Sequence, residues 1–372
     1  MDSATVVPPY VAKPLELLPF RAVMLSPTRV GDPASARALA RPYRDVAARL
    51  TQWIARGDAR ADSSPALYLH EYTSGGLTVR GLVGALRMSE RAEALAERAV
   101  WPHEAIHPEQ AGELADRMLQ MDLNPAPILL VHHGRQELRD LVDRVARTEP
   151  EWRYLDRTGQ RQRLWAVRDA QTVARIGELV AGSRCLLADG HHRYAAYLRL
   201  QEEYPGTPWD AGLAMLVDQA DTPLFLGAIH RTLPGVRLDV LVDATREAGA
   251  EVAERSRHRA LAALDSTHLV LTDGDRWYVV APHGLDREAA VSWLHDHVLP
   301  RLPEPPRRLD HHHTVEEALA ATSSSAPAVL LPSPDFEQVR ALVESGGLLP
   351  EKATSFQPKP SLGVIMRPVN DG

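Results

Sequence analysis

Five consecutive residues, Asp189 to Arg193, place a carboxylate, a glycine, two imidazoles and a guanidinium side by side in the chain. The apolar run that begins at Cys185 predicts a strand ending at this point, and the spacing of Tyr194 and Tyr197 predicts a helix after a tight turn. A helix N-terminus offers unpaired backbone N–H groups and a positive dipole end, so an anion bound there meets main chain, imidazole and guanidinium together. The segment therefore predicts a phosphate-binding loop.

The residue types in this loop each suit a chemical role. Gly190 lets the backbone approach a ligand closely, and Asp189 could hold a metal ion or a hydroxyl that attacks a phosphoryl group. The alternative is structural, because Asp and Gly commonly precede helices and paired histidines can satisfy nearby carbonyls. Cationic side chains in a first turn oppose the helix dipole. Placing His191, His192 and Arg193 there therefore favours an anion site over the structural alternative.

The loop and several other segments resemble, in order, those of the bacterial family called domain of unknown function 1015, over roughly residues 14 to 369. The matching segments are Leu18-Pro19-Phe20-Arg21-Ala22, Pro65 to Tyr72, Pro102-His103-Glu104, Ala115-Asp116-Arg117, Asn124, Pro127-Ile128-Leu129, Asp189 to Leu198, Ile229-His230-Arg231 and Lys352 to Pro360. One departure is the family's Pro-Pro-Tyr-Asp segment, for which the sequence between Gly31 and Val46 has no counterpart.

The same loop is similar to the phosphate-binding motif of ParB-like and sulfiredoxin-like domains, above all to that of free-serine kinases. In those proteins the turn binds nucleotide phosphates, and in the kinases a separate Glu is the base that acts on the acceptor hydroxyl. The resemblance implies that Gly190, His191, His192 and Arg193 bind the donor phosphates and that His192 helps to stabilise charge during transfer. It also implies Mg²⁺ and a nucleotide (ATP or ADP) or pyrophosphate as cofactors, with Asp189 as metal ligand and catalytic residue.

Glu104 is the residue that the sequence context favours as the base, and its alternative is a surface acid that caps the following helix. Arg117 is a candidate phosphate clamp, although Glu113 four residues earlier also predicts an ordinary helix ion pair. His230 and Arg231 end an apolar strand, where a polar pair marks either a site or a sheet rim.

Two further groups lie near the C-terminal end of the sequence. Lys359 sits in a proline-rich tail whose apolar residues predict docking, which would let this lysine reach a phosphate. The run from Asp310 to His313 contains metal-ligand types. Neighbouring residues of a strand point to opposite faces, so three adjacent histidines are not expected to converge on one ion.

The composition and net charge of the chain limit the partners and the cellular location that we expect. The 372-residue chain has a net charge of −7 with dispersed basic residues, so no nucleic-acid partner is expected. A hydrophobic share of 44% and a charged share of 24% are typical of a globular protein, and we expect no membrane association. The single cysteine, Cys185, excludes an intramolecular disulfide, and no signal peptide is recognisable. We expect a cytoplasmic protein.

Alternating helical and strand patterns predict an α+β fold with mixed sheets and flanking helices. We expect a main domain over 14–235 that carries the loop, and a C-terminal section over 236–372 whose tail docks back. The expected helices are 34–56 with an interruption at Pro42, 108–121, 135–147, 170–181, the helix that follows the loop, 238–249, 286–298 and 335–345. The expected strands are 65–73, 77–88, 128–131, 164–167, 185–189, 213–217, 224–233, 268–272, 276–281 and 328–331.

Together these observations predict a small-molecule phosphotransferase that acts on a small hydroxylated metabolite. The main alternative is a non-catalytic nucleotide-binding or nucleotide-hydrolysing regulatory switch of the ParB kind, and a metal-dependent hydrolase comes third. A kinase requires an acceptor-dependent product, whereas a switch binds or hydrolyses nucleotide alone. The donor, the acceptor and the oligomeric state stay open.

Overall fold

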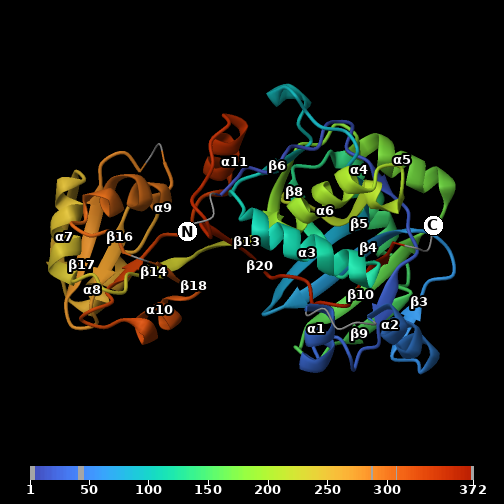
Figure 1. Ribbon diagram of the computed structural model, residues 1–372, viewed down its shortest axis with the longest axis horizontal. Coiled ribbons are helices and arrows are strands. Elements are labelled where there is room, and N and C mark those ends of the chain that lie inside the picture. The colour runs from blue at the N-terminus through green and yellow to red at the C-terminus, as the bar shows by residue number, and fades with distance from the viewer. Residues whose placement is uncertain (1–4, 41–45, 286–287, 307, 370–372) are drawn as a thin grey trace. The chain divides into compact units, whose positions relative to one another are not determined.

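The computed structural model describes residues 5–40, 46–285, 288–306 and 308–369. The chain divides into two compact units, of which the first is Met1–Leu224 with Pro358–Gly372 and the second is Phe225–Gln357. Both units combine sheets and helices (Figure 1), so the α+β class expected from the sequence is confirmed. The first boundary falls at Leu224, earlier than residue 235, because the strand that follows pairs within the second unit.

The first unit is built on a nine-stranded mixed sheet with the order β6-β11-β8-β12-β5-β4-β10-β9, to which β1 adds beside β5. Its strands are β1 (Leu17–Leu18), β4 (Leu67–Ser74), β5 (Leu77–Arg87), β6 (Val100–Pro102), β8 (Ile128–His132), β9 (Trp152–Leu155), β10 (Arg161–Val167), β11 (Cys185–Asp189) and β12 (Ala211–Asp218). Strands β4 and β5 form a hairpin through Gly75 and Gly76, which both have positive φ. Two consecutive positive φ values suit the turn type that matches the twist of paired strands.

Six α-helices accompany this sheet in the described residues: α1 (Pro33–Ala40), α2 (Val46–Ala55), α3 (Pro108–Met121), α4 (Gln136–Ala146), α5 (Ala170–Val180) and α6 (His191–Glu203). Helix α3 begins with Pro108, which has the φ of a first helical turn, and ends before Asp122 in the left-handed conformation. Its buried side chains, Ala115 and Met118 among them, join one core with residues of β8, β11 and α6. This core holds the loop's flanking elements in place.

The tail Pro358–Gly372 belongs to the first unit. Its short strand β21 (Arg367–Pro368) pairs with β7 (Leu123–Asn124), and Met366 pairs with Val23 of β2 (Val23–Leu25), which also pairs with β3 (Ala59–Ala61). Arg367 donates to Asn124 and to two backbone carbonyls. These contacts secure the last described residues to the first unit.

The second unit contains a six-stranded sheet with the order β15-β17-β16-β19-β14-β18 and a separate β13-β20 pair. Its strands are β13 (Phe225–Ala228), β14 (His230–Thr232), β15 (Ala250–Arg255), β16 (Leu269–Thr272), β17 (Trp277–Pro282), β18 (Asp310–His312), β19 (Ala328–Leu330) and β20 (Thr354–Gln357). Its helices are α7 (Leu238–Glu247), α8 (Arg257–Ala262), α9 (Ala290–Trp293), α10 (Val315–Ala321) and α11 (Phe336–Glu344). A small core between α8, α10 and the middle strands supports this unit.

Most expected elements are confirmed, and two differ. The strand expected over 224–233 is two strands, because β13 pairs with β20 whereas β14 pairs with β18 and β19. The helix expected over 286–298 begins at Ala290 and continues as a π-helical turn over Leu294–Val298. The helix expected over 34–56 is α1 and α2, and the interruption expected at Pro42 lies outside the described residues.

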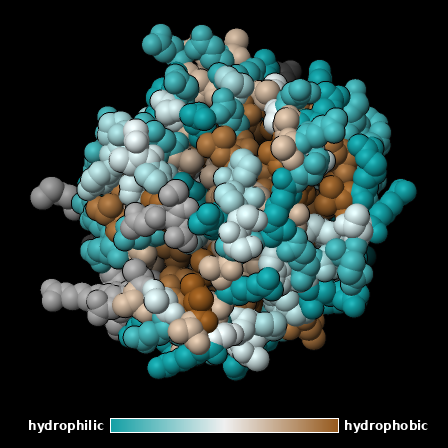
Figure 2. All heavy atoms as spheres, turned by 90° about the vertical axis from the view of Figure 1, so that its right-hand side faces the viewer, coloured by the Kyte–Doolittle hydropathy of each residue, from teal (hydrophilic) through white to brown (hydrophobic). Residues whose placement is uncertain are grey.

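The surface of the protein is mainly polar on the face shown in Figure 2, where hydrophobic side chains lie in hollows between hydrophilic ones. Exposed large hydrophobic side chains, such as Leu77 and Leu155, are scattered along the sequence, which is ordinary for a folded protein. Among the helices of the described residues, none combines the length and the apolar character that crossing a membrane requires.

Candidate functional site

The predicted phosphate-binding loop joins β11 to α6. The first N–H that donates within the helix is that of Tyr194, which binds the carbonyl of Gly190 at 2.8 Å. The N–H groups of His191, His192 and Arg193 therefore precede the helical hydrogen-bond ladder. The N-cap residue of α6 is Gly190, which has no side chain to cap the helix. The first turn has the arrangement of backbone donors that an anion requires.

Gly190 is required by the geometry of the turn. Its φ is +93°, a conformation that residues with a Cβ rarely adopt. A Cβ at this position would also lie 3.0 Å from Nη2 of Arg193 and 3.1 Å from Cγ2 of Ile128. The glycine thus lets the Arg193 side chain pack directly against the loop backbone.

Asp189 is bound by two cationic side chains. Its Oδ2 lies 2.6 Å from Nη2 of Arg193, and its Oδ1 lies 2.5 Å from Nζ of Lys359. The second terminal nitrogen of Arg193 donates to the carbonyl of Pro127 at 2.8 Å. Burial alone would raise the pKa of Asp189, but the charges of Arg193 and Lys359 outweigh it and the pKa is lowered. The site therefore combines an ionised carboxylate with two cations at the start of a helix.

Both histidines of the loop accept hydrogen bonds from the segment before α3. The backbone N–H of His103 donates to Nε2 of His191 at 3.4 Å, and that of His107 donates to Nε2 of His192 at 3.2 Å. The rings of His103 and His191 meet edge to face with centroids 4.5 Å apart, whereas the rings of His107 and His192 are stacked at 6.2 Å. The segment 103–107 thus lies directly beside the loop.

His191 is neutral in this environment, which corrects the charge argument made from the sequence. Burial and the nearby His103 lower the pKa of His191 to about 3. Since Nε2 accepts a hydrogen bond, the ring proton belongs on Nδ1. The first turn therefore carries less positive charge than the sequence alone indicates, and Arg193 is the cation whose charge Asp189 offsets.

Glu104 lies beside the loop because β6 and β11 are parallel. Pro102 pairs with Leu187, so the chain leaves both strands at the same edge of the sheet. Oε1 of Glu104 is 3.5 Å from Nε2 of His103, and its side chain is 13% exposed. His103 in turn packs on His191. The structure thus brings the candidate base into the same cluster as the loop.

Lys359 lies in the tail, and hydrogen bonds to the backbone of the tail hold its side chain near Asp189. The hydroxyl of Tyr72 donates to the carbonyl of Pro358 at 2.7 Å, and Nε2 of Gln160 donates to the carbonyl of Lys359 at 2.8 Å. Sequence reasoning identified the lysine but missed Tyr72 and Gln160, which hold its backbone. The signal for Tyr72 was its place in the strand that resembles the family's first strand.

The structure does not place Arg117 at this site. Its Nη2 pairs with Glu113 at 2.8 Å, as the i,i+4 spacing predicts. Arg117 also lies ten residues after His107, which is about 15 Å along a helix at ~1.5 Å per residue.

His230 and Arg231 belong to the second unit and stabilise it. Arg231 is fully buried and donates to the carbonyls of Ile229, Glu351 and Lys352. Nδ1 of His230 accepts from the backbone N–H of Leu331 at 3.1 Å. Within this unit the pair has a structural role in joining strands.

The histidines of the run from Asp310 to His313 bind separate partners. His312 contacts Thr232 at 3.0 Å, and His313 contacts Ser355 at 3.1 Å. Over residues 5–40, 46–285, 288–306 and 308–369, the structure contains no group of three His, Cys, Asp or Glu side chains arranged to hold a metal ion.

The sequence pattern of the family described as "Protein of unknown function (DUF1015)" matches residues 17–311. This match covers most of the chain, so the protein belongs to that family. None of the curated proteins matches the sequence.

Three solved structures illustrate the likeness to known folds. A free serine kinase variant in complex with AMP is 16% identical, covers 77% of this chain and 92% of its own, and gives a TM-score of 0.41. SbnI with a C-terminal truncation from Staphylococcus aureus is 13% identical, with coverages of 71% and 82% and a TM-score of 0.41. A conserved hypothetical protein from Pyrococcus furiosus is 16% identical, with coverages of 71% and 90% and a TM-score of 0.37. All three TM-scores are below 0.5, so these similarities carry no argument about function.

Proposed function

We propose that the protein transfers a phosphoryl group from a nucleotide (ATP or ADP) or from pyrophosphate to a hydroxyl group of a small metabolite, in the manner of a free-serine kinase. The observation that carries the proposal is the start of α6. Backbone N–H groups precede the helical ladder there, and the side chains of Arg193 and Lys359 converge on Asp189. A helix start with adjacent cations is suited to phosphate.

In this proposal the loop binds the donor. The N–H groups of His191, His192 and Arg193 and the positive end of the helix dipole bind phosphate oxygens. Arg193 is held in one orientation by Asp189 and by the carbonyl of Pro127. Donors that are already oriented stabilise the charge that develops during transfer without further reorganisation. His192, stacked on His107, is the imidazole placed to assist at this step.

Glu104 acts on the acceptor. Its carboxylate takes the proton of the acceptor hydroxyl while the hydroxyl oxygen forms a bond to the transferred phosphorus. The bond between phosphorus and the leaving oxygen breaks, and its electron pair stays on the leaving phosphate. Packing of His103 against His191 is what keeps Glu104 next to the donor loop.

Asp189 fits a magnesium ion only as a single protein ligand. Mg²⁺ commonly binds through one or two carboxylates together with substrate phosphates. Oδ1 of Asp189 contacts Lys359, so a metal at that oxygen requires the lysine to move. When bound, the ion would supply neutralisation of phosphate charge. Lys359 supplies a positive charge at the same carboxylate when no metal is present.

A regulatory nucleotide-binding switch of the ParB kind is the second candidate. Both oxygens of Asp189 are occupied by cations. A carboxylate held in this way orients the two cations toward a bound anion, and it is not available for chemistry. The switch and the kinase are separated by whether an acceptor-dependent product forms.

The test is calorimetry with ATP, ADP and pyrophosphate, each with and without Mg²⁺, followed by a screen for phosphorylated products against a panel of hydroxylated metabolites. Glu104→Gln should leave donor affinity within about twofold and abolish acceptor-dependent turnover, because a base on the acceptor contributes to the chemical step alone. Asp189→Asn should lower Mg²⁺-dependent donor binding and turnover together.

Glu109→Gln is the matched control, since Glu109 is an exposed acid of α3. Full turnover in Glu104→Gln would remove Glu104 from the mechanism. Nucleotide binding without any product from any acceptor would favour the switch, and no binding of any of the three donors would contradict both functions.

A further inference from the structure

A second group of charged side chains lies on the other face of the large sheet. Tyr72, which contacts the tail segment carrying Lys359, follows Glu71 on β4. Successive side chains of a strand point to opposite faces, so Glu71 faces away from that tail segment. Its neighbours across the sheet are Arg80 on β5 and Arg163 on β10, and Arg163 is opposite Arg153 on β9.

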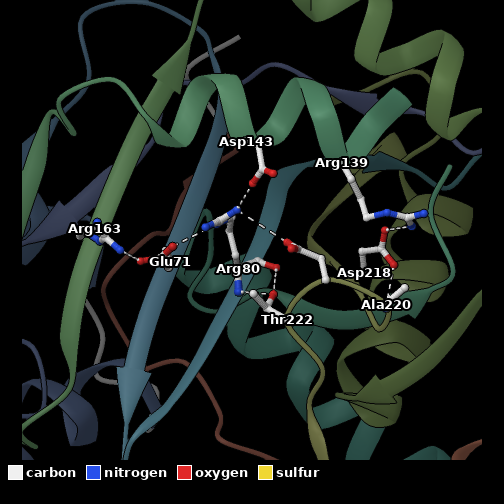
Figure 3. A network of polar contacts seen from close by, with 9 residues as sticks. Glu71, Arg80, Arg139, Asp143, Arg163, Asp218, Ala220 and Thr222 are labelled. Atoms are coloured by element: carbon white, nitrogen blue, oxygen red, sulfur yellow. Dashed lines mark hydrogen bonds and ion pairs between the residues drawn. The ribbon is translucent and has the colours of Figure 1, made fainter. Parts of the chain in front are cut away.

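Glu71 and Arg80 are satisfied by one another and by further partners (Figure 3). Oε2 of Glu71 lies 3.0 Å from Nε of Arg80, and Oε1 contacts Arg163. Arg80 also pairs with Asp143 of α4 at 2.8 Å and lies 3.7 Å from Asp221. The carboxylates of Glu71, Asp143 and Asp221 therefore surround Arg80.

Cationic side chains predominate toward the sheet edge, where three arginines share one face. Arg153 and Arg163 are direct cross-strand neighbours, and Arg161 is two residues before Arg163 on the same face. The one ion pair of Arg153 in the described residues is with Glu149 at 4.0 Å, between side chains that are 70% and 81% exposed, and such a pair contributes little. Like charges directly opposite in a sheet destabilise it.

These arginines line a cavity of about 720 Å³. The side chains suited to binding an anion are Thr73, Thr78, Arg153, Arg161 and Arg163. Glu71 also lines the cavity, and its carboxylate is held by Arg80 and Arg163. The hydroxyls of Thr73 and Thr78 lie 2.9 Å apart and add neutral donors to the guanidinium groups. The volume is within the range of small-molecule sites, roughly 300 to 1,000 Å³.

We propose that this cavity binds a small molecule with at least two negative charges, at a site distinct from the loop of Asp189. Guanidinium groups match carboxylates and phosphates with two parallel hydrogen bonds. An anion between Arg153, Arg161 and Arg163 offsets the repulsion that these side chains otherwise impose on the sheet. The ligand is small because the cationic surface is concentrated in one cavity, in a chain whose net charge is −7.

The test is calorimetry of the full-length protein with citrate as a carboxylate probe and tripolyphosphate as a phosphate probe. Arg161→Gln should weaken binding of at least one probe by about tenfold or more. Arg175→Gln is the matched control, because Arg175 is half-exposed on α5 and paired with Glu178 outside the cavity. It should change affinity less than twofold. If Arg161→Gln weakens the binding of citrate alone, the ligand is a carboxylate. If it weakens the binding of tripolyphosphate alone, the ligand is a phosphate.

Arg153→Gln supplies a second readout. Removing one of two opposed arginines should raise the Tm of the ligand-free protein by roughly 1 °C. It should also reduce the additional increase in Tm that follows when the effective probe, the one of the two that binds, is added. The proposal is overturned if Arg161→Gln binds both probes normally, or if Arg175→Gln weakens binding equally. It is also overturned if Arg193→Lys, at the loop, abolishes binding of the effective probe while Arg161→Gln does not.

Discussion

Asp189 and Glu71 are two carboxylates of the first unit that each bridge two cations, yet their surroundings differ. Both partners of Glu71 are on neighbouring strands, and its side chain is 2% exposed. Asp189 is 21% exposed, and its partners are Arg193, one helical turn later, and Lys359, 170 residues later. The comparison teaches that a carboxylate bridging two cations has a structural role when the sheet supplies both cations. At the start of a helix, the same arrangement is accessible to a ligand.

The energetic consequence follows from burial. Removing one member of a buried ion pair typically costs about 3–5 kcal/mol, because the remaining charge is left without compensation in a low-dielectric environment. Pairs with substantial exposure contribute about 0–1 kcal/mol. Replacing Glu71 should therefore lower the stability of the protein more than replacing Asp189. Replacing Asp189 should affect donor binding more than replacing Glu71.

The largest expected effect is on stability, in Glu71→Ala. This change leaves Arg163 without its carboxylate and removes one of the partners of Arg80, so we expect the free energy of unfolding to fall by about 3 kcal/mol. Asp189→Asn should cost less, about 1 kcal/mol, because the amide keeps an oxygen that accepts a hydrogen bond from one of the two cations. Urea denaturation at pH 7 measures both, and equal costs would contradict the distinction between a structural and a ligand-binding carboxylate.

The second effect is on donor binding, in Arg193→Lys. The guanidinium contacts Asp189 and the carbonyl of Pro127 at once, and a lysine ammonium cannot reproduce this two-sided geometry. Affinity for the donor should fall by about tenfold, whereas Tm should stay nearly unchanged. Arg199→Lys on the same helix is the control, since Arg199 pairs with Glu203 on an exposed surface. Loss of Tm with intact affinity per folded molecule would make Arg193 structural.

How much the sequence predicts differs between local and long-range features. The strand, turn and helix around Gly190 follow from local patterns, as does α3, whose expected limits agree with Pro108–Met121. The hydrogen bond between His103 and His191 does not. It depends on β6, a three-residue strand too short to show a periodic pattern, and on its parallel pairing with β11. Sheet order is a property of tertiary packing that one sequence does not encode locally.

Arg231 shows why polar residues after an apolar strand are ambiguous. Charged side chains are almost never fully buried unless paired, so the sequence pattern favours a rim or a site. The structure instead buries Arg231 fully and directs its guanidinium to backbone carbonyls from two separate segments. The carbonyls of Glu351 and Lys352 come from a segment far along the chain, which no local spacing rule identifies.

The smallest expected effect is that of Lys359→Met. The lysine side chain is 46% exposed, so at pH 7 the free energy of unfolding should fall by less than about 1 kcal/mol. A change close to that of Glu71→Ala would instead make Lys359 as important to folding as the strand arginines.

The pH dependence of Lys359→Met tests the contact itself. Arg193 and Lys359 lower the pKa of Asp189 below its ordinary value of 3.8, against the effect of burial. A carboxyl group with a lowered pKa in the folded state contributes stability that is complete above the unfolded pKa, about 3.9. That stability is lost as the pH falls through the lower, folded pKa. The difference between wild type and Lys359→Met should therefore be full at pH 7 and pH 5, and it should shrink below about pH 4 as the pH falls toward the lower, folded pKa of Asp189. Lys13→Met is the control, because Lys13 donates to the carbonyl of Ala96, so its effect should not depend on the protonation of a carboxylate. A difference that stays constant or widens below pH 4 would mean that Lys359 does not stabilise the ionised Asp189. The contacts of Tyr72 and Gln160 with the backbone, rather than the ion pair, would then hold the segment around Lys359.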